Sequence, residues 1–328
     1  DSVNYCETCG GDYSAENIWS KVLHIVRTNP EVAGEAYSVI ELCDYIPSVL
    51  IGKRCRNAYS TIAYKALWAK KWGGLPAEEL YRELGGEKFV EIRNSMTGEP
   101  CFGTEPVGTL CKEWAEELGL SQDVVVCAGV IDSISGAIGC SPGKMALNMG
   151  TSACLIAVDP DFKDRMIKGV FGQFPDGVVP GMMCFEMGLS SFGDNFAWLK
   201  RILAGTMKTL LKGQVPDEVL ASAEDKILPS LADAAAALPF REDAPFATDW
   251  FNGRRSPDPD SSLKATVSGL GLATNAAEIY YAIVEATAFG VKAMVDTRVD
   301  NGVALEEITA IGGIAVKSPF IVQFLADV

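Results

Sequence analysis

The sequence predicts an α/β protein with about two domains. Two patterns favour this fold class. Short, continuous apolar runs of strand length are closed by glycine or polar turns, and longer segments carry apolar residues at helical spacing. The chain has 328 residues, more than a typical domain of about 100–200 residues holds. Strand-like runs begin at Val124, so we expect one domain over residues 1–122 and a second over residues 123–328.

The first predicted domain is mainly helical. Ser14 is the expected N-cap of a helix that ends before Pro30, and a second helix is expected over residues 32–50. Pro47 should bend or end that second helix, because proline lacks the backbone N–H that a helix interior needs. The remaining predictions are a loop and helix over 61–72, a glycine- and proline-rich loop region over 73–107, and a short helix over 110–118.

The second predicted domain combines strands with long helices. We expect strands over residues 124–127, 145–149, 153–158 and 307–311. Only Gly150, Thr151 and Ser152 separate two of these strands, which predicts a tight hairpin. The predicted helices cover residues 190–203, 208–238 and 275–299, and a last one begins at Ser318. Residues 240–263 are expected to form a long loop, and such loops in compact domains are often functional.

Composition and charge exclude several classes of protein. The formal net charge is −15 with a pI near 4.6, which disfavours nucleic acid and anionic membrane surfaces as partners. No apolar run reaches the roughly 18 residues that a membrane span needs, and no basic-then-apolar leader opens the chain. The chain begins with Asp1 rather than Met and ends inside an apolar stretch, so we expect a piece of a longer protein.

The ten cysteines favour a reducing compartment. Most lie in apolar runs, such as Cys127, Cys154 and Cys184, which is typical of buried reduced thiols in a cytoplasmic protein. Cys6 and Cys9 form a C-x-x-C motif, for which a zinc site, a redox pair and two incidental thiols are the alternatives. A structural zinc site needs four ligands, and no second pair follows at useful spacing. We therefore favour incidental thiols and expect no metal held by protein side chains alone.

A carboxylate follows the first strand of the second predicted domain. The strand is closed by Ala128–Gly129, and Asp132 comes three residues later. Ligands bind at the carboxyl ends of strands in open α/β sheets, where a carboxylate can accept a substrate proton or help orient Mg²⁺. The alternative is that Asp132 caps the next helix, because aspartate is a favoured N-cap. His24 is the only histidine and lies in a helical apolar pattern, which disfavours a histidine base.

Two glycine-containing turns are further candidates. Gly150–Ser152 at the hairpin tip combines accessible backbone N–H groups with two hydroxyl donors, which suits a phosphate. Gly312–Gly313 lies between a predicted strand and a predicted helix, where a helix N-terminus favours phosphate. Each signal alone is weak, since most such sequences are plain turns. Together with Asp132 they indicate a site at the strand ends.

Several segments carry a specific family pattern. Ala265–Leu270, followed by Glu278–Ile279 and Ala282–Glu285, fits the second signature of the FGGY carbohydrate kinases at every constrained position. Further segments are similar to L-ribulokinases in particular, namely Tyr64–Trp68, Met149–Ser152, Trp250–Pro257, Glu285–Gly290 and Gly312–Lys317. The chain therefore resembles the FGGY carbohydrate kinases, and within them the L-ribulokinases, over nearly its whole length.

The resemblance implies an actin/hexokinase-like fold of two domains with ribonuclease-H-like cores, and sugar and ATP bound between them. Residues 1–122 would be the remainder of an N-terminal sugar-binding domain, and residues 123–328 a truncated C-terminal nucleotide-binding domain. Asp132 matches the family's catalytic base, and Lys65 and Glu186 match positions that contact a ketopentose. The positions that match nucleotide contacts or motifs are Gly150, Thr151, Ser152, Gly193, Gly312, Gly313 and Lys317, the last being Asn in many relatives.

The resemblance predicts that MgATP phosphorylates a ketopentose, with L-ribulose 5-phosphate as the expected product. Two departures keep alternatives open. Ser133–Ile134 follows Asp132 where ribulokinases usually have Ala-His, so D-ribulose, D-xylulose or a pentitol stays an alternative substrate. The family's Asp-x-Gly-Thr phosphate hairpin is not in this sequence, so a non-catalytic, ligand-binding fragment stays an alternative. We expect a sugar and ATP as partners, no nucleic acid and no membrane, and leave a homodimer open.

Overall fold

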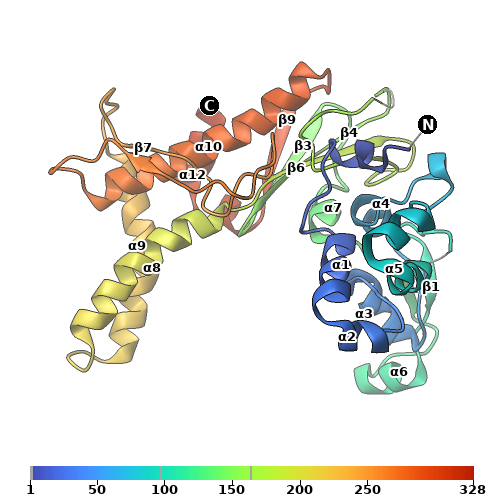
Figure 1. Ribbon diagram of the computed structural model, residues 1–328. Coiled ribbons are helices and arrows are strands. Elements are labelled where there is room, and N and C mark those ends of the chain that lie inside the picture. Colours follow the sequence, from blue (N-terminus) through green and yellow to red (C-terminus); the bar gives the residue numbers. More distant parts are fainter. Residues whose placement is uncertain (1–2, 97, 163–164) are drawn as a thin grey trace. The chain divides into compact units, whose positions relative to one another are not determined.

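The computed structural model describes residues 3–96, 98–162 and 165–328 and divides the chain into two compact units (Figure 1). Unit 1 comprises Asp1–Gly139, Val158–Met166 and Gly172–Phe185. Unit 2 comprises Cys140–Ala157, Ile167–Phe171 and Glu186–Val328. The two units interleave along the sequence, and the domain boundary expected near residue 122 stays a prediction.

Unit 1 is built mainly from short helices. They are the 3-10 helix η1 (Tyr5–Cys9), α1 (Ile18–Thr28), α2 (Pro30–Glu35), α3 (Leu42–Ile51), α4 (Tyr59–Lys65), the 3-10 helix η2 (Lys70–Trp72), α5 (Glu78–Asn94), α6 (Lys112–Leu118) and α7 (Asp132–Gly136). Helices α1 and α5 pack through edge-to-face contacts among Trp19, Tyr81 and Phe89, whose ring centroids are 5.0 to 5.9 Å apart. Such pairs add about 0.5–1.5 kcal/mol each beyond the burial of their area.

A second small core surrounds two short strands of unit 1. Strands β1 (Pro106–Thr109) and β2 (Val125–Cys127) are antiparallel, with Thr109 opposite Val125. The side chains buried around them include Ile51, Leu110, Ala115 and Val126. The strand predicted at residues 124–127 is confirmed. It belongs to a two-stranded sheet with β1 and not to the sheet that contains β3, β4 and β9.

The helices near the start of unit 1 begin and break at unexpected residues. Helix α1 begins after Asn17 and not at Ser14, because the Ser14 carbonyl accepts the Asn17 N–H at 3.1 Å in a turn that precedes the helix. The helix expected over residues 32–50 is divided into α2 and α3, since the backbone is extended at Ala36. Pro47 lies inside α3 without ending it.

Helix α5 lies in a region that the sequence predicts to be loop. Gly85 and Gly86 interrupt the helical pattern, and Gly86 has a φ of 74°, where the helix kinks. Glycine is a weak helix former, which hides the helix in the sequence. The aromatic side chains of Tyr81 and Phe89, on either side of the kink, hold both halves against α1. Tertiary packing therefore outweighs the weak local propensity.

The main sheet has the strand order β5-β6-β4-β3-β9. Its strands are β3 (Lys144–Met149), β4 (Ala153–Asp159), β5 (Gly172–Pro175), β6 (Met183–Leu189) and β9 (Glu307–Ile311). In unit 2, β3 is antiparallel to β4, with Met149 opposite Ala153, and parallel to β9, with Leu147 opposite Ala310. The predicted hairpin and the predicted strand at residues 307–311 are therefore confirmed.

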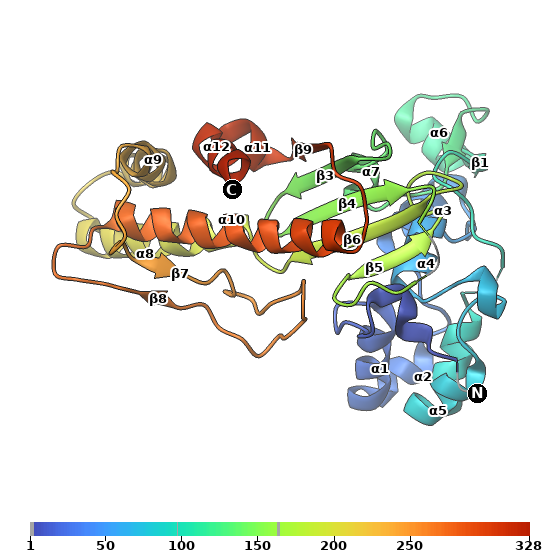
Figure 2. The same ribbon diagram turned by 90° about the horizontal axis from the view of Figure 1, so that it is seen from above.

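Long helices complete unit 2. They are α8 (Gly193–Leu211), α9 (Asp217–Ala236), α10 (Ala276–Asp300), α11 (Gly313–Lys317) and α12 (Pro319–Asp327), with two short strands, β7 (Phe246–Ala247) and β8 (Val267–Ser268). Helices α8 and α9 lie side by side in Figure 1, and Figure 2 shows the full length of α10. A capping box of Asn275 and Glu278 starts α10. Near its other end, the buried Arg298 donates to the Leu155 carbonyl of β4.

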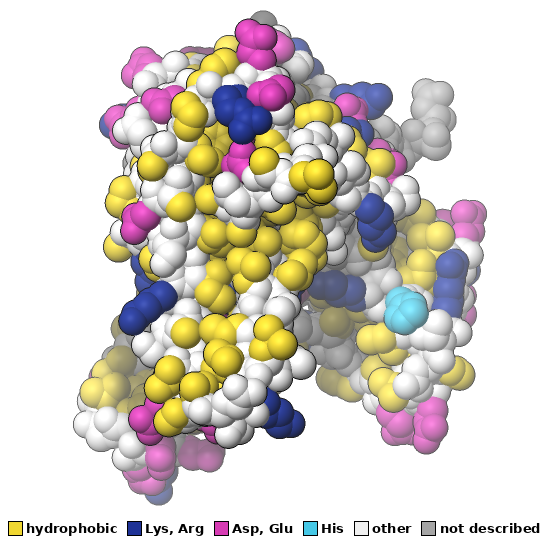
Figure 3. All heavy atoms as spheres, turned by 90° about the vertical axis from the view of Figure 1, so that its left-hand side faces the viewer, with side chains coloured by type: hydrophobic (Ala, Val, Ile, Leu, Met, Phe, Trp, Pro, Cys, Tyr) yellow, Lys and Arg dark blue, Asp and Glu magenta, His cyan; other side chains and the backbone are white. Residues whose placement is uncertain are grey.

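The surface agrees with the sequence predictions in part. His24 is exposed on α1, and its ring is visible in Figure 3. Cys184 is buried as predicted and Cys154 is half-buried, but Cys127 is exposed. The side chains of β2 alternate, so Val126 points into the core and Cys127 to solvent. Within the described part of the chain, no helix has both the length and the apolarity to cross a membrane.

Candidate active site

The tip of the β3–β4 hairpin is bonded to the start of α8. The Gly150 N–H donates to the Ser152 carbonyl at 3.0 Å and closes the turn. The Gly150 carbonyl accepts the Gly193 N–H at 3.0 Å, and the Thr151 carbonyl accepts the Phe192 N–H at 2.7 Å. These carbonyls accept hydrogen bonds from N–H groups at the start of α8, which have no partner within the helix. The turn is therefore held by main-chain bonds, while the Thr151 side chain stays exposed.

Two of the predicted glycines lie where no side chain fits. A Cβ atom on Gly193 would be 2.7 Å from the Gly150 carbonyl oxygen and 2.9 Å from Ile314. Gly312 has a φ of 100°, and a Cβ atom there would be 2.7 Å from the Met149 carbonyl oxygen. Gly313 differs, because a Cβ atom would meet nothing within 4 Å. The hairpin tip, α8 and α11 thus approach each other through Gly193 and Gly312. We call this meeting point the hairpin junction.

The hairpin junction borders a cavity of about 950 Å³ within unit 2. Four of the residues that the sequence predicts for a nucleotide line this cavity: Gly150, Gly193, Gly313 and Lys317. The other three adjoin it in the chain without being part of its lining: Thr151, Ser152 and Gly312. The structure therefore gathers the three separate sequence motifs at one place.

The walls of this cavity are mainly apolar. They include Phe196 of α8, Tyr280 of α10, Phe320 of α12, and Leu228 and Pro229 of α9. An ion pair between Lys200 and Asp225 joins α8 to α9, with the atoms Nζ and Oδ1 3.4 Å apart. A concave site with apolar walls and a few charged groups suits a planar ring that carries a polar tail.

Asp132 is held in unit 1 by the close passage of the chain that precedes it. A Cβ atom on Gly129 would lie 1.8 Å from the Cys43 carbonyl oxygen, so only glycine fits there. Val130 packs directly on Gly103, where a Cβ atom would be 2.1 Å from Val130 Cγ2. Asp132 then opens α7 as its first residue, after the N-cap Ile131. The Asp132 carboxylate accepts the Ser133 N–H at 2.8 Å and is otherwise exposed at the surface of the unit.

Lys65 is the last residue of α4, also in unit 1. The Tyr13 hydroxyl donates to the Lys65 carbonyl and fixes the end of this helix. The Lys65 side chain is half-buried and close to Cys43, where burial raises the thiol pKa to about 11 and the lysine charge acts in the opposite direction. Cys43 is the residue whose carbonyl Gly129 contacts. Lys65 and the segment that carries Asp132 therefore approach the same residue.

Glu186 lies in the middle of β6 and belongs to unit 2. Its side chain is 3% exposed, between the fully buried Phe185 and Met187. Its carbonyl accepts the Phe171 N–H at 2.9 Å. Arg255 passes over β6 at Gly188, two residues after Glu186. A Cβ atom on Gly188 would lie 3.0 Å from the Arg255 guanidinium Nη1. Arg255 also lies over the Phe171 ring, 5.0 Å from its centroid.

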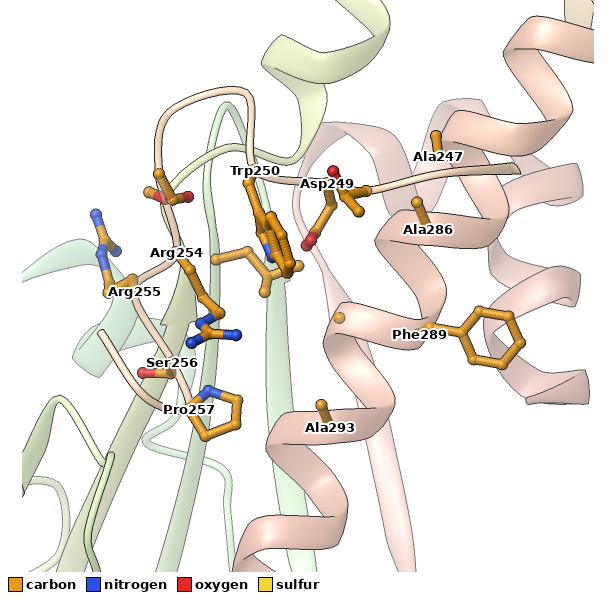
Figure 4. Close-up of a pocket in the computed structure, with 15 residues that line it drawn as sticks. Ala247, Asp249, Trp250, Arg254, Arg255, Ser256, Pro257, Ala286, Phe289 and Ala293 are labelled. Atoms are coloured by element: carbon orange, nitrogen blue, oxygen red, sulfur yellow. The ribbon is translucent and has the colours of Figure 1, made fainter. Parts of the chain in front are cut away.

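A smaller pocket of about 270 Å³ lies between α10 and the loop that the sequence singles out at residues 240–263. Figure 4 shows Asp249, Trp250 and Arg254 on this loop, facing α10. Burial raises the pKa of the Asp249 carboxyl to about 6. The carboxylate rests on Gly290, where a Cβ atom would be 2.3 Å from Asp249 Oδ2. The Arg254 guanidinium lies 5.4 Å from the centroid of Trp250.

Asp249 and Arg254 carry charged groups in this pocket and were not predicted as site residues from the sequence. The available signal was the long loop at residues 240–263, in which Arg254 belongs to the Trp250–Pro257 segment and Asp249 directly precedes it. A metal centre is not indicated by the side chains alone. Among residues 3–96, 98–162 and 165–328, no group of three or more His, Cys, Asp or Glu is placed to hold an ion.

Comparison with known proteins agrees with this geometry. Residues 145–328 match the model of the FGGY family of carbohydrate kinases, C-terminal domain. The chain is 35% identical to a ribulokinase from Vibrio parahaemolyticus over 99% of this chain and 59% of that protein. It is 36% identical to a ribulokinase from Bacillus licheniformis over 99% of this chain and 57% of that protein. The chain thus spans less than two thirds of the length of these curated relatives.

Solved structures establish the fold. A xylulose kinase from Rhodospirillum rubrum superposes with a TM-score of 0.73 at 21% identity, covering 98% of this chain and 60% of that one. A Plasmodium falciparum glycerol kinase with ADP gives a TM-score of 0.68 at 17% identity, covering 99% of this chain and 61% of that one. These neighbours confirm the α/β, actin/hexokinase-like fold class. Because the family model matches more than half of the sequence, the chain belongs to the FGGY family of carbohydrate kinases.

Proposed function

We propose that the protein transfers the γ-phosphoryl group of ATP to the terminal hydroxyl of a ketopentose, with L-ribulose as substrate and L-ribulose 5-phosphate as product. Membership of a carbohydrate-kinase family supports the reaction class, and the ribulokinase names of the relatives support the ketopentose. The observation that carries the proposal is the hairpin junction, where three separate glycine motifs border one cavity of about 950 Å³.

The nucleotide would enter the cavity of unit 2. Its planar base suits the apolar walls around Phe196 and Tyr280, and its phosphates would extend toward the hairpin tip. There, the exposed Thr151 and the half-buried Ser152 offer hydroxyl groups. Lys317 lines the cavity and supplies a positive charge. The hairpin tip would then lie at the phosphate that is transferred.

Asp132 would act as the general base. It accepts the proton of the sugar hydroxyl as the hydroxyl oxygen attacks the γ-phosphorus in line, and ADP leaves. Phosphoryl transfer needs little covalent help, so most of the rate should come from positioning and charge neutralisation. Lys65 and Glu186 would hold the ketopentose, by a positive charge and by hydrogen bonds to its hydroxyl groups. The exposed position of Asp132 within unit 1 leaves its carboxylate accessible to a substrate.

Magnesium fits this arrangement only in company with the nucleotide. Mg²⁺ usually keeps several waters and is bound by one or two carboxylates together with substrate phosphates. Asp132 is the proposed carboxylate, acting directly or through water. When bound, Mg²⁺ neutralises charge that develops on the phosphate oxygens. Cytoplasmic location belongs to the same proposal, and it is supported by the ten cysteines, none of which is joined in a disulfide.

A different ketopentose is the second candidate substrate, because Ile134 replaces the histidine that ribulokinases usually have. Ile134 is 2% exposed and packs in the interior of unit 1, so it offers no polar group to a sugar. We expect a panel of L-ribulose, D-ribulose, D-xylulose and ribitol, assayed by ADP release, to give the highest kcat/KM with L-ribulose. A preference of about tenfold or more for another sugar would reassign the substrate. If the full-length protein releases no ADP in response to any of these sugars, the proposed function is refuted.

A further inference from the structure

Cys6 and Cys9 lie one turn apart on the 3-10 helix η1 of unit 1. Side chains at positions i and i+3 of a 3-10 helix eclipse each other, and a rise of about 2.0 Å per residue places their Cα atoms about 6 Å apart. A disulfide joins Cα atoms that are about 4.4–6.8 Å apart. The backbone of η1 therefore already holds the two Cα atoms at a separation that a disulfide can span.

The two sulfur atoms differ in exposure and in hydrogen bonding. Cys9 is 3% exposed, whereas Cys6 is only half-buried. Cys9 Sγ lies 3.4 Å from the Cys6 carbonyl, to which it donates. When Cys6 is ionised, a hydrogen bond from the Cys9 S–H to the Cys6 sulfur, in place of the one to the carbonyl, lowers the pKa of the Cys6 thiol to about 7. The same bond together with burial raises the pKa of Cys9. An accessible, easily ionised sulfur beside a buried thiol is suited to thiol–disulfide exchange.

The surrounding charges do not account for the ionisation of Cys6. Repulsion by Asp12 raises the pKa of both thiols, and Tyr13 lies close enough to interact with Cys9. From η2, Lys71 approaches the helix but pairs with Glu7, with Nζ and Oε1 2.7 Å apart. Loss of the Cys9 thiol should therefore raise the pKa of Cys6, because burial and Asp12 both act in that direction.

Other thiols of unit 1 have a different environment. Burial raises the pKa of Cys43 and of Cys101 to about 11, which makes both poor nucleophiles near neutral pH. Cys127 is exposed on β2 and provides a single accessible thiol for comparison. The pairing of Cys6 with Cys9 is thus a local property of η1 rather than a general property of the cysteines in this unit.

We propose that Cys6 and Cys9 form a redox-active dithiol that reduces low-molecular-weight disulfides of the glutathione class and becomes a Cys6–Cys9 disulfide. The Cys6 thiolate attacks one sulfur of oxidised glutathione, the glutathione S–S bond breaks, and one glutathione thiolate leaves and takes a proton from solvent. Cys9 then loses its proton to solvent, and its sulfur attacks Cys6 and releases the second glutathione. Two protein thiols lose two electrons, and one disulfide becomes two thiols.

A zinc site is the rival use of a C-x-x-C motif. It needs four ligands. Over the described ranges 3–96, 98–162 and 165–328, no third or fourth acidic, histidine or cysteine ligand is placed with this pair. The redox use needs only the two residues that η1 already brings together, and it does not depend on the kinase reaction proposed above.

The test treats the reduced full-length protein with oxidised glutathione and maps thiols by mass spectrometry of peptides. We expect wild type to yield a Cys6–Cys9 disulfide without bound glutathione, and Cys9→Ser to stop at a Cys6–glutathione mixed disulfide.

A second measurement compares the rates at which iodoacetamide alkylates individual cysteines at pH 7, and it uses the wild-type protein alone. About half of Cys6 is ionised at a pKa of about 7, against about 1% of a thiol at the ordinary 9.0. The weaker nucleophilicity of the more acidic thiolate reduces that advantage to about fivefold, and the exposed thiol of Cys127 is the internal comparison.

Cys127→Ser is the matched control, since it removes an exposed thiol outside η1 and should leave the products at Cys6 and Cys9 unchanged. Circular dichroism of Cys9→Ser checks that the variant folds. The proposal is overturned if Cys6 of wild type alkylates no faster than Cys127. It is also overturned if glutathione stays bound to Cys6 of wild type while Cys9 remains reduced.

Discussion

The hairpin junction of unit 2 is held by main-chain contacts, whereas the Asp132 segment of unit 1 presents one side chain. At the junction, the carbonyls of Gly150 and Thr151 accept N–H groups at the start of α8. In unit 1, Gly129 lets the chain pass Cys43, and a single carboxylate follows. An added side-chain atom should disturb the close main-chain packing of the hairpin junction. Loss of the carboxylate should remove the one functional group of the Asp132 segment. The two regions should therefore fail in different ways.

The largest effect on stability is expected from Gly129→Ala. The new Cβ atom would lie 1.8 Å from the Cys43 carbonyl oxygen, and a backbone atom has no rotamer by which to move away. We expect unfolding in urea to show a loss of about 3 kcal/mol or more, at or above the upper end of the usual range for a single substitution. Gly139→Ala is the control, because a Cβ atom there meets nothing within 4 Å. A loss within about 1 kcal/mol of the control would mean that this passage is not tight.

A smaller, pH-dependent effect is expected at Asp44, which supports the start of α4. Its carboxylate is buried and accepts the Ala58 N–H at 2.8 Å, and burial raises its pKa to about 6. Because the folded-state pKa exceeds the unfolded value of 3.8, the stabilisation is complete below pH 3.8 and is lost as the pH rises through about 6. Between pH 4 and 7.5 this group should remove about 1–3 kcal/mol from the free energy of unfolding.

Asp44→Asn removes this titration while its amide oxygen can still accept the Ala58 N–H. Urea unfolding at several pH values should give a flatter curve for Asp44→Asn than for wild type, with the two converging near pH 4. Asp123→Asn removes an exposed carboxylate of the same unit and serves as the control for net charge. Parallel curves for wild type and Asp44→Asn would contradict the raised pKa.

Sequence signals were sufficient where an element carries its own local pattern. The β3–β4 hairpin, strand β9 and helix α10 lie within one or two residues of their predicted bounds, because apolar runs, a turn and a capping box mark them directly. Helix α5 was missed, since its Gly85–Gly86 pair conceals it and its packing partner α1 lies far away in the sequence. The chain leaves α2 at Ala36, which is neither proline nor glycine, so this residue type did not predict a break between α2 and α3.

In the candidate site, too, local sequence patterns predicted some features, while contacts between distant segments decided others. The motif glycines of the hairpin junction could be identified from short patterns beside predicted strands. The function of Gly129 could not, because its contact, the Cys43 carbonyl, belongs to a distant helix. The burial that raises the pKa of Asp249 likewise depends on α10, which follows its loop in the sequence. Contacts between distant segments therefore decide which of several similar residues have unusual properties.

The smallest of these effects separates two neighbouring motifs of the hairpin junction. Gly193→Ala would press a Cβ atom against the Gly150 carbonyl and Ile314, and we expect ATP affinity to fall about tenfold or more by calorimetry, or about 1.4 kcal/mol. Gly313→Ala has free space and should change stability by less than about 0.5 kcal/mol. If Gly193→Ala and Gly313→Ala lose the same ATP affinity and the same stability, close packing at Gly193 is not what determines ATP binding.

The most direct test of the kinase proposal is kcat for ketopentose-dependent ADP release by Asp132→Asn in the full-length protein. We expect a fall of about 10²–10⁴-fold, the usual loss for a missing general base. Asp123→Asn should stay within about twofold of wild type, since surface changes away from a site have little effect. A kcat for a correctly folded Asp132→Asn within about tenfold of wild type would contradict the assignment of Asp132 as the base.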